Sequence, residues 1–181
     1  MCQGTVKDRA PNYAEKTARL KLNAGQRQAV EMAVHQPLGV LTGGAGTGKT
    51  AVLQVIHRIA EQVGVPALQM ALSGRAAQRM REATARPAST IAAFLRTAER
   101  RTLDPDGESL VIIDEASMLD LPLMYSVVRA VPARARLLLV GDPYQLPPIG
   151  FGLVFPILAA SQDIPESNLS RCTGRRIERH P

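Results

Sequence analysis

The sequence predicts an α/β fold: a three-layer sandwich with helices on both faces of a largely parallel central sheet. Short apolar runs typical of buried strands alternate with longer segments of helical periodicity. Glycine or acidic residues follow several of these runs directly. In a parallel sheet, residues beyond the carboxyl ends of the strands meet at one edge. The expected strands are 38–41, 65–72, 110–113 and 136–140.

The helices are assigned from apolar periodicity and from signals at their ends. The first, 21–35, has Asn23 as a good N-cap residue and stops before Pro37. Pro122 lies in the first turn of the helix expected at 121–130, a position that proline favours. The remaining helices are expected at 50–63, 76–83, 90–101 and 154–160.

A glycine-rich segment, Gly43-Gly44-Ala45-Gly46-Thr47-Gly48-Lys49-Thr50, joins the first strand to the next helix. Its spacing is the G-x-x-x-x-G-K-[ST] of a P-loop. Such loops turn backbone N–H groups toward an anion, and the helix N-terminus adds partial positive charge. Lys49 can reach the β- and γ-phosphates, and the Thr50 hydroxyl can ligate Mg²⁺. The sequence therefore predicts nucleoside triphosphate binding at these residues and at Ala51 beside them.

The strand 110–113 delivers two acids, Asp114 and Glu115. Beside a P-loop, one such carboxylate holds Mg²⁺, usually through water, and the next orients or deprotonates the attacking water. We assign the metal role to Asp114 and the water role to Glu115. Taken alone, a strand ending in solvated acids would be the simpler interpretation, but the preceding P-loop favours the catalytic one.

The segment Gly141-Asp142-Pro143-Tyr144-Gln145 follows the last expected strand. Gln145 can hydrogen-bond the γ-phosphate or the attacking water and so report which nucleotide is bound. Considered only locally, Gln145 is a polar turn residue. Its place beyond a strand of the same sheet favours the sensing role. The catalytic candidates are therefore Lys49, Glu115 and Gln145.

The composition describes a globular protein suited to a polyanionic partner. Its 181 residues, 45% of them hydrophobic, suffice for one domain with a core. The formal net charge of +6 suits a polyanion such as nucleic acid, although a solvated basic surface would carry the same charge. Aromatic residues make up only 3%, so we do not expect base stacking on aromatic rows to dominate binding.

Cysteine usage and hydropathy favour a cytoplasmic protein without a membrane partner. Cys2 and Cys172 lie near opposite ends, with neither metal-site spacing nor a disulfide framework. A reduced compartment is the expectation for such a pair. The polar N-terminus lacks the apolar core of a signal peptide, and no apolar run reaches membrane-spanning length.

Five segments, in this order, resemble the first motor domain of a superfamily 1 DNA helicase of the RecD/TraA-like branch. They are LNAGQRQAV from Leu22, GGAGTGKT from Gly43, SGRAA from Ser73, DEASM from Asp114 and GDPYQLPPIG from Gly141. Five ordered motifs are far more specific than a P-loop alone. The resemblance implies a RecA-like P-loop NTPase fold, and ATP hydrolysis that drives 5′-to-3′ translocation along single-stranded DNA. It leaves repair, recombination and conjugative transfer open.

The resemblance also implies roles for single residues. Gln26 contacts the adenine and selects ATP, and Gln145 couples the nucleotide state to the grip on DNA. The single-strand path that it implies includes Ser73, Gly74, Arg75 and Thr90. Arg75 adds positive charge, and phosphate contacts give most of the sequence-independent affinity for nucleic acid. For Arg79 and Arg81, a solvated helix face is the better interpretation.

The sequence departs from the family pattern in two places within the domain. Family members often carry Thr-Ile-His after the second motif, where this chain has Thr90-Ile91-Ala92. A polar DNA contact is therefore missing. The strand-separating hairpin of the family has only about residues 96–109 available here, so we expect any such pin to be short.

We expect three parts: an N-terminal extension at 1–20, partly disordered; a RecA-like ATP-binding domain at 21–165; and a basic, atypical tail at 166–181. The tail reads NLSRCTGRRIERHP from Asn168, whereas relatives continue into a second RecA-like domain. We attribute this ending to truncation or to a changed reading frame. Intact-mass analysis and the coding sequence test that expectation.

Two alternatives remain open at this point. A P-loop kinase or other NTPase would need an acceptor-binding lid, and the segment 141–150 argues against it. A non-catalytic nucleotide-binding fragment would assemble with a separate second RecA-like domain or with other helicase or nuclease subunits, or would be only a degenerate remnant, and the end at Pro181 favours this alternative. The rate of ATP hydrolysis with and without single-stranded DNA separates a working motor from such a fragment.

Overall fold

A computed structural model of the chain describes residues 22–100, 107–145, 148 and 150–169. Six strands form one sheet in the order β3-β2-β4-β5-β1-β6, and every strand pair is parallel. The predicted parallel sheet is therefore confirmed. The strands are β1 (Leu38–Thr42), β2 (Ala67–Ala71), β3 (Ala88–Thr90), β4 (Leu110–Asp114), β5 (Arg136–Gly141) and β6 (Glu166–Asn168).

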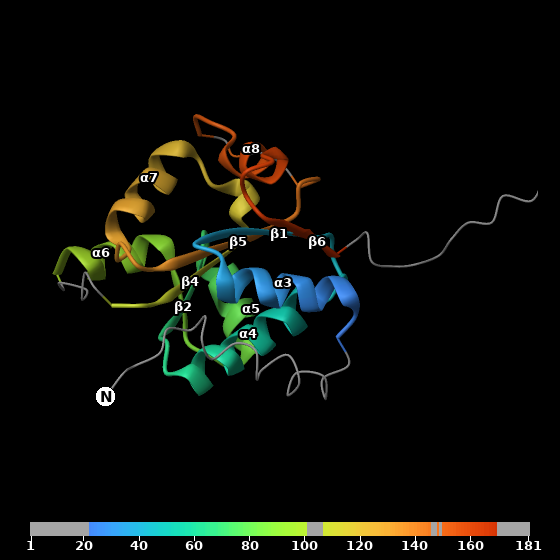
Figure 1. Ribbon diagram of the computed structural model, residues 1–181. Helices are drawn as coiled ribbons and strands as arrows, with labels where there is room; N and C mark the ends of the chain where they lie inside the picture. Colours follow the sequence, from blue (N-terminus) through green and yellow to red (C-terminus); the bar gives the residue numbers. More distant parts are fainter. Residues whose placement is uncertain (1–21, 101–106, 146–147, 149, 170–181) are drawn as a thin grey trace, which may run out of the picture.

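Helices cover both faces of this sheet, as a parallel sheet requires. In Figure 1, α3, α4 and α5 lie below the sheet, and α7 and α8 lie above it. This arrangement is the predicted three-layer sandwich. The helices are α3 (Ala24–His35), α4 (Lys49–Val63), α5 (Gly74–Thr84), α6 (Ile91–Arg100), α7 (Leu121–Ala130) and α8 (Val154–Ala160), with a short 3₁₀ helix η1 (Ala116–Met118) after β4.

The two faces of the sheet have separate hydrophobic cores because neighbouring residues of a strand point to opposite sides. In β4, Leu110 and Ile112 belong to the core under α3 and α4, whereas Val111 and Ile113 belong to the other core. All four side chains are buried. The unbroken apolar run of β4 therefore serves two cores at once, which explains why it shows no alternation of apolar and polar residues.

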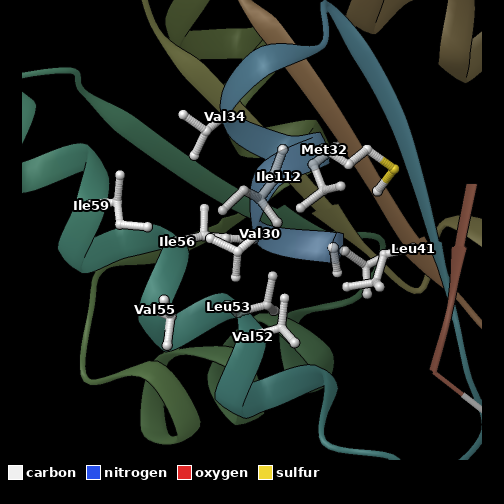
Figure 2. Close-up of a cluster of buried hydrophobic side chains, with 14 of the residues drawn as sticks. Val30, Met32, Val34, Leu41, Val52, Leu53, Val55, Ile56, Ile59 and Ile112 are labelled. Atoms are coloured by element: carbon white, nitrogen blue, oxygen red, sulfur yellow. The ribbon is translucent and has the colours of Figure 1, made fainter. Parts of the chain in front are cut away.

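The core between α3, α4 and the sheet is built from aliphatic side chains, and Figure 2 shows most of it. Val30 and Val34 on α3 face Val52, Ile56 and Ile59 on α4. Close packing of this kind fixes the position of α4, the helix that begins at the P-loop. The opposite core contains Phe155 of α8, Leu119, and Met124 and Val127 of α7.

The helix ends follow from local chemistry. Asn23 and Gln26 form a capping box at the start of α3: Asn23 Oδ1 accepts from Gln26 N at 2.8 Å, and Gln26 Oε1 accepts from Asn23 N at 3.1 Å. Asp120 caps α7 by accepting from Leu123 N, with Pro122 in the first turn. Within the described part of the chain, no helix has the length and apolar character needed to cross a membrane.

Two edge strands differ from the sequence-based expectation. β3 and β6, of three residues each, carry no apolar run, so only their pairing with β2 and β1 makes them strands. The predicted domain end at residue 165 is too early, because β6 pairs with β1 and Leu169 is buried in the core. Thr42 Oγ1 also donates to Glu166 Oε1 at 2.6 Å. The predicted extension at 1–20 and the tail from 170 onward lie outside the described residues.

Candidate nucleotide-binding site

The predicted P-loop connects β1 to α4, as the sequence indicated. Gly46 and Gly48 have φ values of 76° and 90°, in the left-handed region that residues with a Cβ rarely adopt. Gly48 is also the N-cap of α4. The first N–H groups of an α-helix have no partner inside the helix, so the start of α4 offers donors to an anion.

The polar side chains of the loop bond to the loop itself. Lys49 Nζ donates to the carbonyl oxygens of Gly43 and, at 2.8 Å, of Gly44. Thr47 Oγ1 also donates to Gly44 O, at 2.9 Å. A bond of 3.2 Å from Gly43 N to Gly141 O ties the loop to the end of β5. The Lys49 ammonium group is thus held at the loop, where a phosphate can attract it with a stronger, charge-assisted bond.

Gln26 lies against the P-loop. A Cβ built on Gly48 would approach Gln26 Nε2, the end of a flexible side chain, to 2.3 Å, and the φ of 90° is what requires glycine here. The capping box uses the Gln26 carbonyl oxygen, while the amide nitrogen points to the loop. The structure therefore brings Gln26 to the nucleotide site, and its contact with adenine stays a prediction.

Asp114 and Glu115 follow one another but have different surroundings. Asp114 is the half-buried last residue of β4, and burial raises the pKa of its carboxyl group. A bond from Glu115 N at 2.9 Å and the positive charges of Lys49 and Arg79 lower this pKa, to a smaller extent. Glu115 has a φ of 57°, unusual for a residue other than glycine, and is the N-cap residue of η1.

The oxygen atoms of the Asp114 and Thr50 side chains are ligands of the kind that a magnesium ion prefers. A buried carboxylate with a raised pKa gains from a nearby cation. Mg²⁺ typically uses one or two protein carboxylates together with substrate phosphates and water. Asp114 and the exposed Thr50 at the start of α4 match that pattern. Among the described residues, no group of three or more His, Cys, Asp or Glu side chains could hold a metal on its own.

Gln145 is placed by a turn at the end of β5. Its backbone N donates to Asp142 O at 3.1 Å, and Asp142 Oδ1 accepts from Tyr144 N at 3.0 Å. The side-chain oxygen of Gln145 accepts from Ser117 Oγ at 3.3 Å. Ser117 belongs to η1, two residues after Glu115. Gln145 therefore lies beside the predicted catalytic acids, and Ser117 is a partner that the sequence did not reveal.

The segment after β5 is close to α8. A Cβ on Gly141 would approach the Phe155 ring to 2.7 Å and Ser117 N to 3.0 Å. Glycine at this position therefore lets β5, η1 and α8 meet. Phe155 is fully buried, and no pattern in the sequence indicated that its ring packs at Gly141, the end of β5.

The predicted DNA-contacting residues lie at the other end of the same sheet edge. Ser73 directly precedes α5, and Thr90 ends β3, in register with Ala71 of β2. Ser73 Oγ accepts from Ala76 N, and Thr90 Oγ1 accepts from Ala93 N, both at 3.1 Å. Both hydroxyls therefore cap helices, which is a structural role independent of DNA. Gly74 and Arg75 are exposed at the start of α5.

One contact links α5, which follows β2, to the residue after the neighbouring strand β4. Arg79 Nη2 of α5 donates to Glu115 Oε1 at 2.8 Å. The sequence pattern indicated only a solvated helix face for Arg79. The two residues are 36 positions apart, so no local signal could have indicated the pair.

Comparison with known proteins identifies the family. A family model described as "AAA domain" matches residues 21–176. The chain belongs to the AAA domain family. Its match extends past β6, in agreement with the sheet described above, which continues beyond residue 165.

Curated relatives of this AAA domain confirm the predicted RecD/TraA-like resemblance. It is 39% identical over 160 residues to the "ATP-dependent RecD2 DNA helicase" of Deinococcus radiodurans, covering 86% of this chain and 22% of that protein. It is 32% identical to the "RecBCD enzyme subunit RecD" of Mycolicibacterium smegmatis (84% and 33% covered). It is 34% identical to the "Conjugal transfer protein TraA" of Rhizobium radiobacter (77% and 13%). The chain thus spans a third or less of each relative.

Among solved structures, the Pif1 helicase from Candida albicans has a similar fold. The TM-score is 0.62 at 20% sequence identity, and the match covers 82% of this chain and 40% of that one. At this level of identity, the similarity concerns the fold alone. It confirms the predicted RecA-like architecture of this AAA domain.

Proposed function

We propose that this domain is the ATP-binding motor domain of a DNA helicase, which hydrolyses Mg·ATP to drive movement along single-stranded DNA. The observation that carries this proposal is the convergence of the P-loop, Asp114-Glu115 and Gln145 at one edge of a parallel sheet. The names of the relatives, among them an ATP-dependent DNA helicase, support the same activity.

The P-loop residues bind and orient the nucleotide in this proposal. Residues 43–48 and the start of α4 surround the phosphates with N–H donors, and Lys49 leaves its loop carbonyls to reach the β- and γ-phosphates. Thr50 and Asp114 hold Mg²⁺, which, when bound, neutralises charge on the phosphate oxygens. The amide of Gln26 beside Gly48 contacts the adenine and so selects ATP.

Glu115 and Gln145 act on the water in the hydrolytic step. The water oxygen bonds to the γ-phosphorus as the bond from that phosphorus to the ADP oxygen breaks, and Glu115 accepts the proton that the water loses. Gln145, held by Ser117 and by the Asp142 turn, senses the γ-phosphate. The products are ADP, inorganic phosphate and a proton.

In this proposal the motor also requires single-stranded DNA and a second RecA-like domain or another subunit. Single-stranded DNA follows the edge formed by Ser73, Gly74, Arg75 and Thr90, and its movement is 5′ to 3′. A second RecA-like domain, or another subunit, supplies an arginine to the γ-phosphate, which can contribute about 10³–10⁵-fold to hydrolysis. We therefore expect slow turnover from this chain by itself.

The test is Mg²⁺-dependent ATP binding and hydrolysis, with and without an oligo(dT) strand. We expect tight Mg·ATP binding and slow hydrolysis that the strand accelerates. Lys49→Ala should lower turnover by about 10²–10³-fold, the usual effect of losing one donor to the transition state. Arg58→Ala, an exposed change on α4, is the matched control and should behave as wild type.

Three results would decide against the proposal or narrow it. Failure to bind Mg·ATP would exclude a motor domain, as would turnover that Lys49→Ala leaves unchanged. Binding with no turnover under either condition would favour the alternative, a nucleotide-binding fragment that depends on a separate second domain.

A further inference from the structure

Arg79 and Glu115 form an ion pair that links α5 to the end of β4. We propose that Arg79 restrains the Glu115 carboxylate, and that a phosphate of single-stranded nucleic acid, by competing for Arg79, releases it. DNA binding and ATP hydrolysis would thus be coupled through this pair. The inference rests on the proposed function, because it takes Glu115 as the acceptor of the water proton.

Glu115 has an unusual backbone conformation, and its side chain contacts Arg79 of α5. Its φ of 57° is a conformation that costs free energy for a residue with a Cβ, and the surrounding fold must hold it in place. Glu115 occupies the N-cap position of η1, yet its side chain makes no capping bond there. The carboxylate is therefore free to pair with α5, and Arg79 is the partner it has.

Arg79 pairs across the fold rather than along its own helix. Glu82, one turn further along α5, accepts a bond from Gln78 at 2.9 Å instead. The position of α5 is fixed because Ala76, Ala77 and Met80 are buried against the sheet. The guanidinium group consequently starts from a well-defined point, and its 2.8 Å contact with Glu115 is a feature of the tertiary structure.

A nucleic acid strand can reach Arg79 without disturbing the fold. The Arg79 side chain is 65% exposed, whereas that of Glu115 is 24% exposed. Arg79, in the middle of α5, lies one helical turn after Arg75, so both are on the same side of the helix. A phosphate and a carboxylate compete for the same planar fork of donors on an arginine.

The expected size of the effect follows from the exposure of the pair. A partly exposed ion pair changes the equilibrium constant between its paired and unpaired states by about 1.4- to 5-fold. Arg79 therefore acts as a modest brake on hydrolysis in the absence of DNA, and it accounts for only a part of any larger stimulation. It is a positioning residue, since it acts through Glu115.

The first arm of the test measures ATP hydrolysis with and without oligo(dT) for wild type, Arg79→Ala, Arg79→Lys and Arg81→Ala. Arg79→Ala should raise the DNA-independent rate by about 1.4- to 5-fold and lower the stimulation ratio by the same factor. Arg79→Lys should retain part of the restraint. Arg81→Ala, an exposed change on the same helix, should change neither quantity. An unchanged or reduced basal rate in Arg79→Ala, with ATP binding intact, would overturn the inference.

The second arm does not depend on hydrolysis, because coupling between two sites is reciprocal. Glu115→Gln removes the charge that holds Arg79, so it should raise the affinity for oligo(dT) by about 1.4- to 5-fold. The slope of log affinity against log salt should be shallower in Arg79→Ala than in wild type by about 0.7, the value for one lost phosphate contact on a single strand. The gain in affinity from Glu115→Gln should vanish in the Arg79→Ala background.

The outcomes separate the two proposals. Wild-type protein that neither binds nor hydrolyses Mg·ATP overturns the proposed function. Equal oligo(dT) affinities of wild type and Glu115→Gln, in a protein that does hydrolyse ATP, overturn only the coupling through Arg79. Wild type that does not bind oligo(dT) overturns both.

Discussion

Two regions lie at the carboxyl ends of the strands of one sheet: the P-loop corner, residues 43–50, and the β2–β3 edge, residues 73–75 and Thr90. Their polar residues nevertheless have different roles. At the corner, Lys49 and Thr47 bond to carbonyls of the loop itself. At the edge, Ser73 and Thr90 cap α5 and α6. The first set holds a loop ready for an anion, whereas the second set has a role in stability that is sufficient to explain its presence.

A buried chain of polar side chains connects α4, which follows the P-loop, to β2 and α5. His57 of α4 lies 2.9 Å from Gln69 Oε1 of β2, and Gln69 Nε2 donates to Thr84 Oγ1 at 2.8 Å at the end of α5. Buried polar groups are costly unless they are satisfied, so this chain fixes α4, β2 and α5 relative to one another. A mutation at either region must therefore be examined for stability as well as for binding.

The largest difference between the two regions is expected when one glycine from each is replaced by alanine. Gly48→Ala should cost about 1–2 kcal/mol of strain, because Gly48 has a φ of 90° and faces Gln26. If the loop moves to relieve this strain, Mg·ATP binding should weaken by up to about tenfold. Gly74→Ala meets open space and should stabilise the protein by about 0.4–1 kcal/mol.

Thermal unfolding and nucleotide titration of both variants provide the measurements. If Gly48→Ala bound Mg·ATP as wild type does and unfolded at the same temperature, the loop conformation would not matter as argued. If Gly74→Ala were stable but bound oligo(dT) more weakly, the backbone at the start of α5 would be a DNA contact.

A smaller effect is expected at the edge. Ser73→Ala removes the cap of α5 and should lower the free energy of unfolding by about 1 kcal/mol. Ser73→Asp keeps a capping oxygen and should restore the stability, but its negative charge would repel a phosphate. Denaturant unfolding together with oligo(dT) titration distinguishes the roles: equal DNA affinity in wild type and both variants would leave Ser73 as a cap alone.

The smallest effect concerns pH. Burial lowers the pKa of His57 below its ordinary 6.5, more than the bond to Gln69 raises it; nearby Arg86 lowers it further and Glu61 raises it. As the pH falls through 6.5, His57 becomes protonated in the unfolded chain before it does in the folded one. The contribution of His57 to the free energy of unfolding should therefore be full above pH 6.5 and fall as the pH drops. Denaturant unfolding between pH 8 and pH 5 should show this loss, and His57→Gln should remove part of it. The same slope in both proteins would assign the loss to other groups.

Much of the fold could be predicted because its elements carry strong local signals. The apolar runs of β1, β4 and β5 and the cap at Asn23 match the structure closely. The P-loop, the two acids after β4 and Gln145 were predicted to share one sheet edge, and they do. Their roles toward ATP and Mg²⁺ stay predictions that the experiments above address.

Other features could not be predicted because they depend on distant partners. β3 and β6 are short and partly polar, and they become strands only by pairing with a neighbour. The packing of Phe155 against Gly141 and the bond between Ser117 and Gln145 join segments that no local periodicity relates.

The sequence by itself determined which segments form the buried sheet, in what order the motifs follow the strands, and hence where a triphosphate can bind. Those properties reside in short stretches, through side-chain periodicity, glycine spacing and helix caps. Only the tertiary structure decided that Glu115 adopts a positive φ and pairs with Arg79. That contact depends on how α5 packs against the sheet. It joins residues 36 positions apart, and no local sequence pattern relates the segments around them.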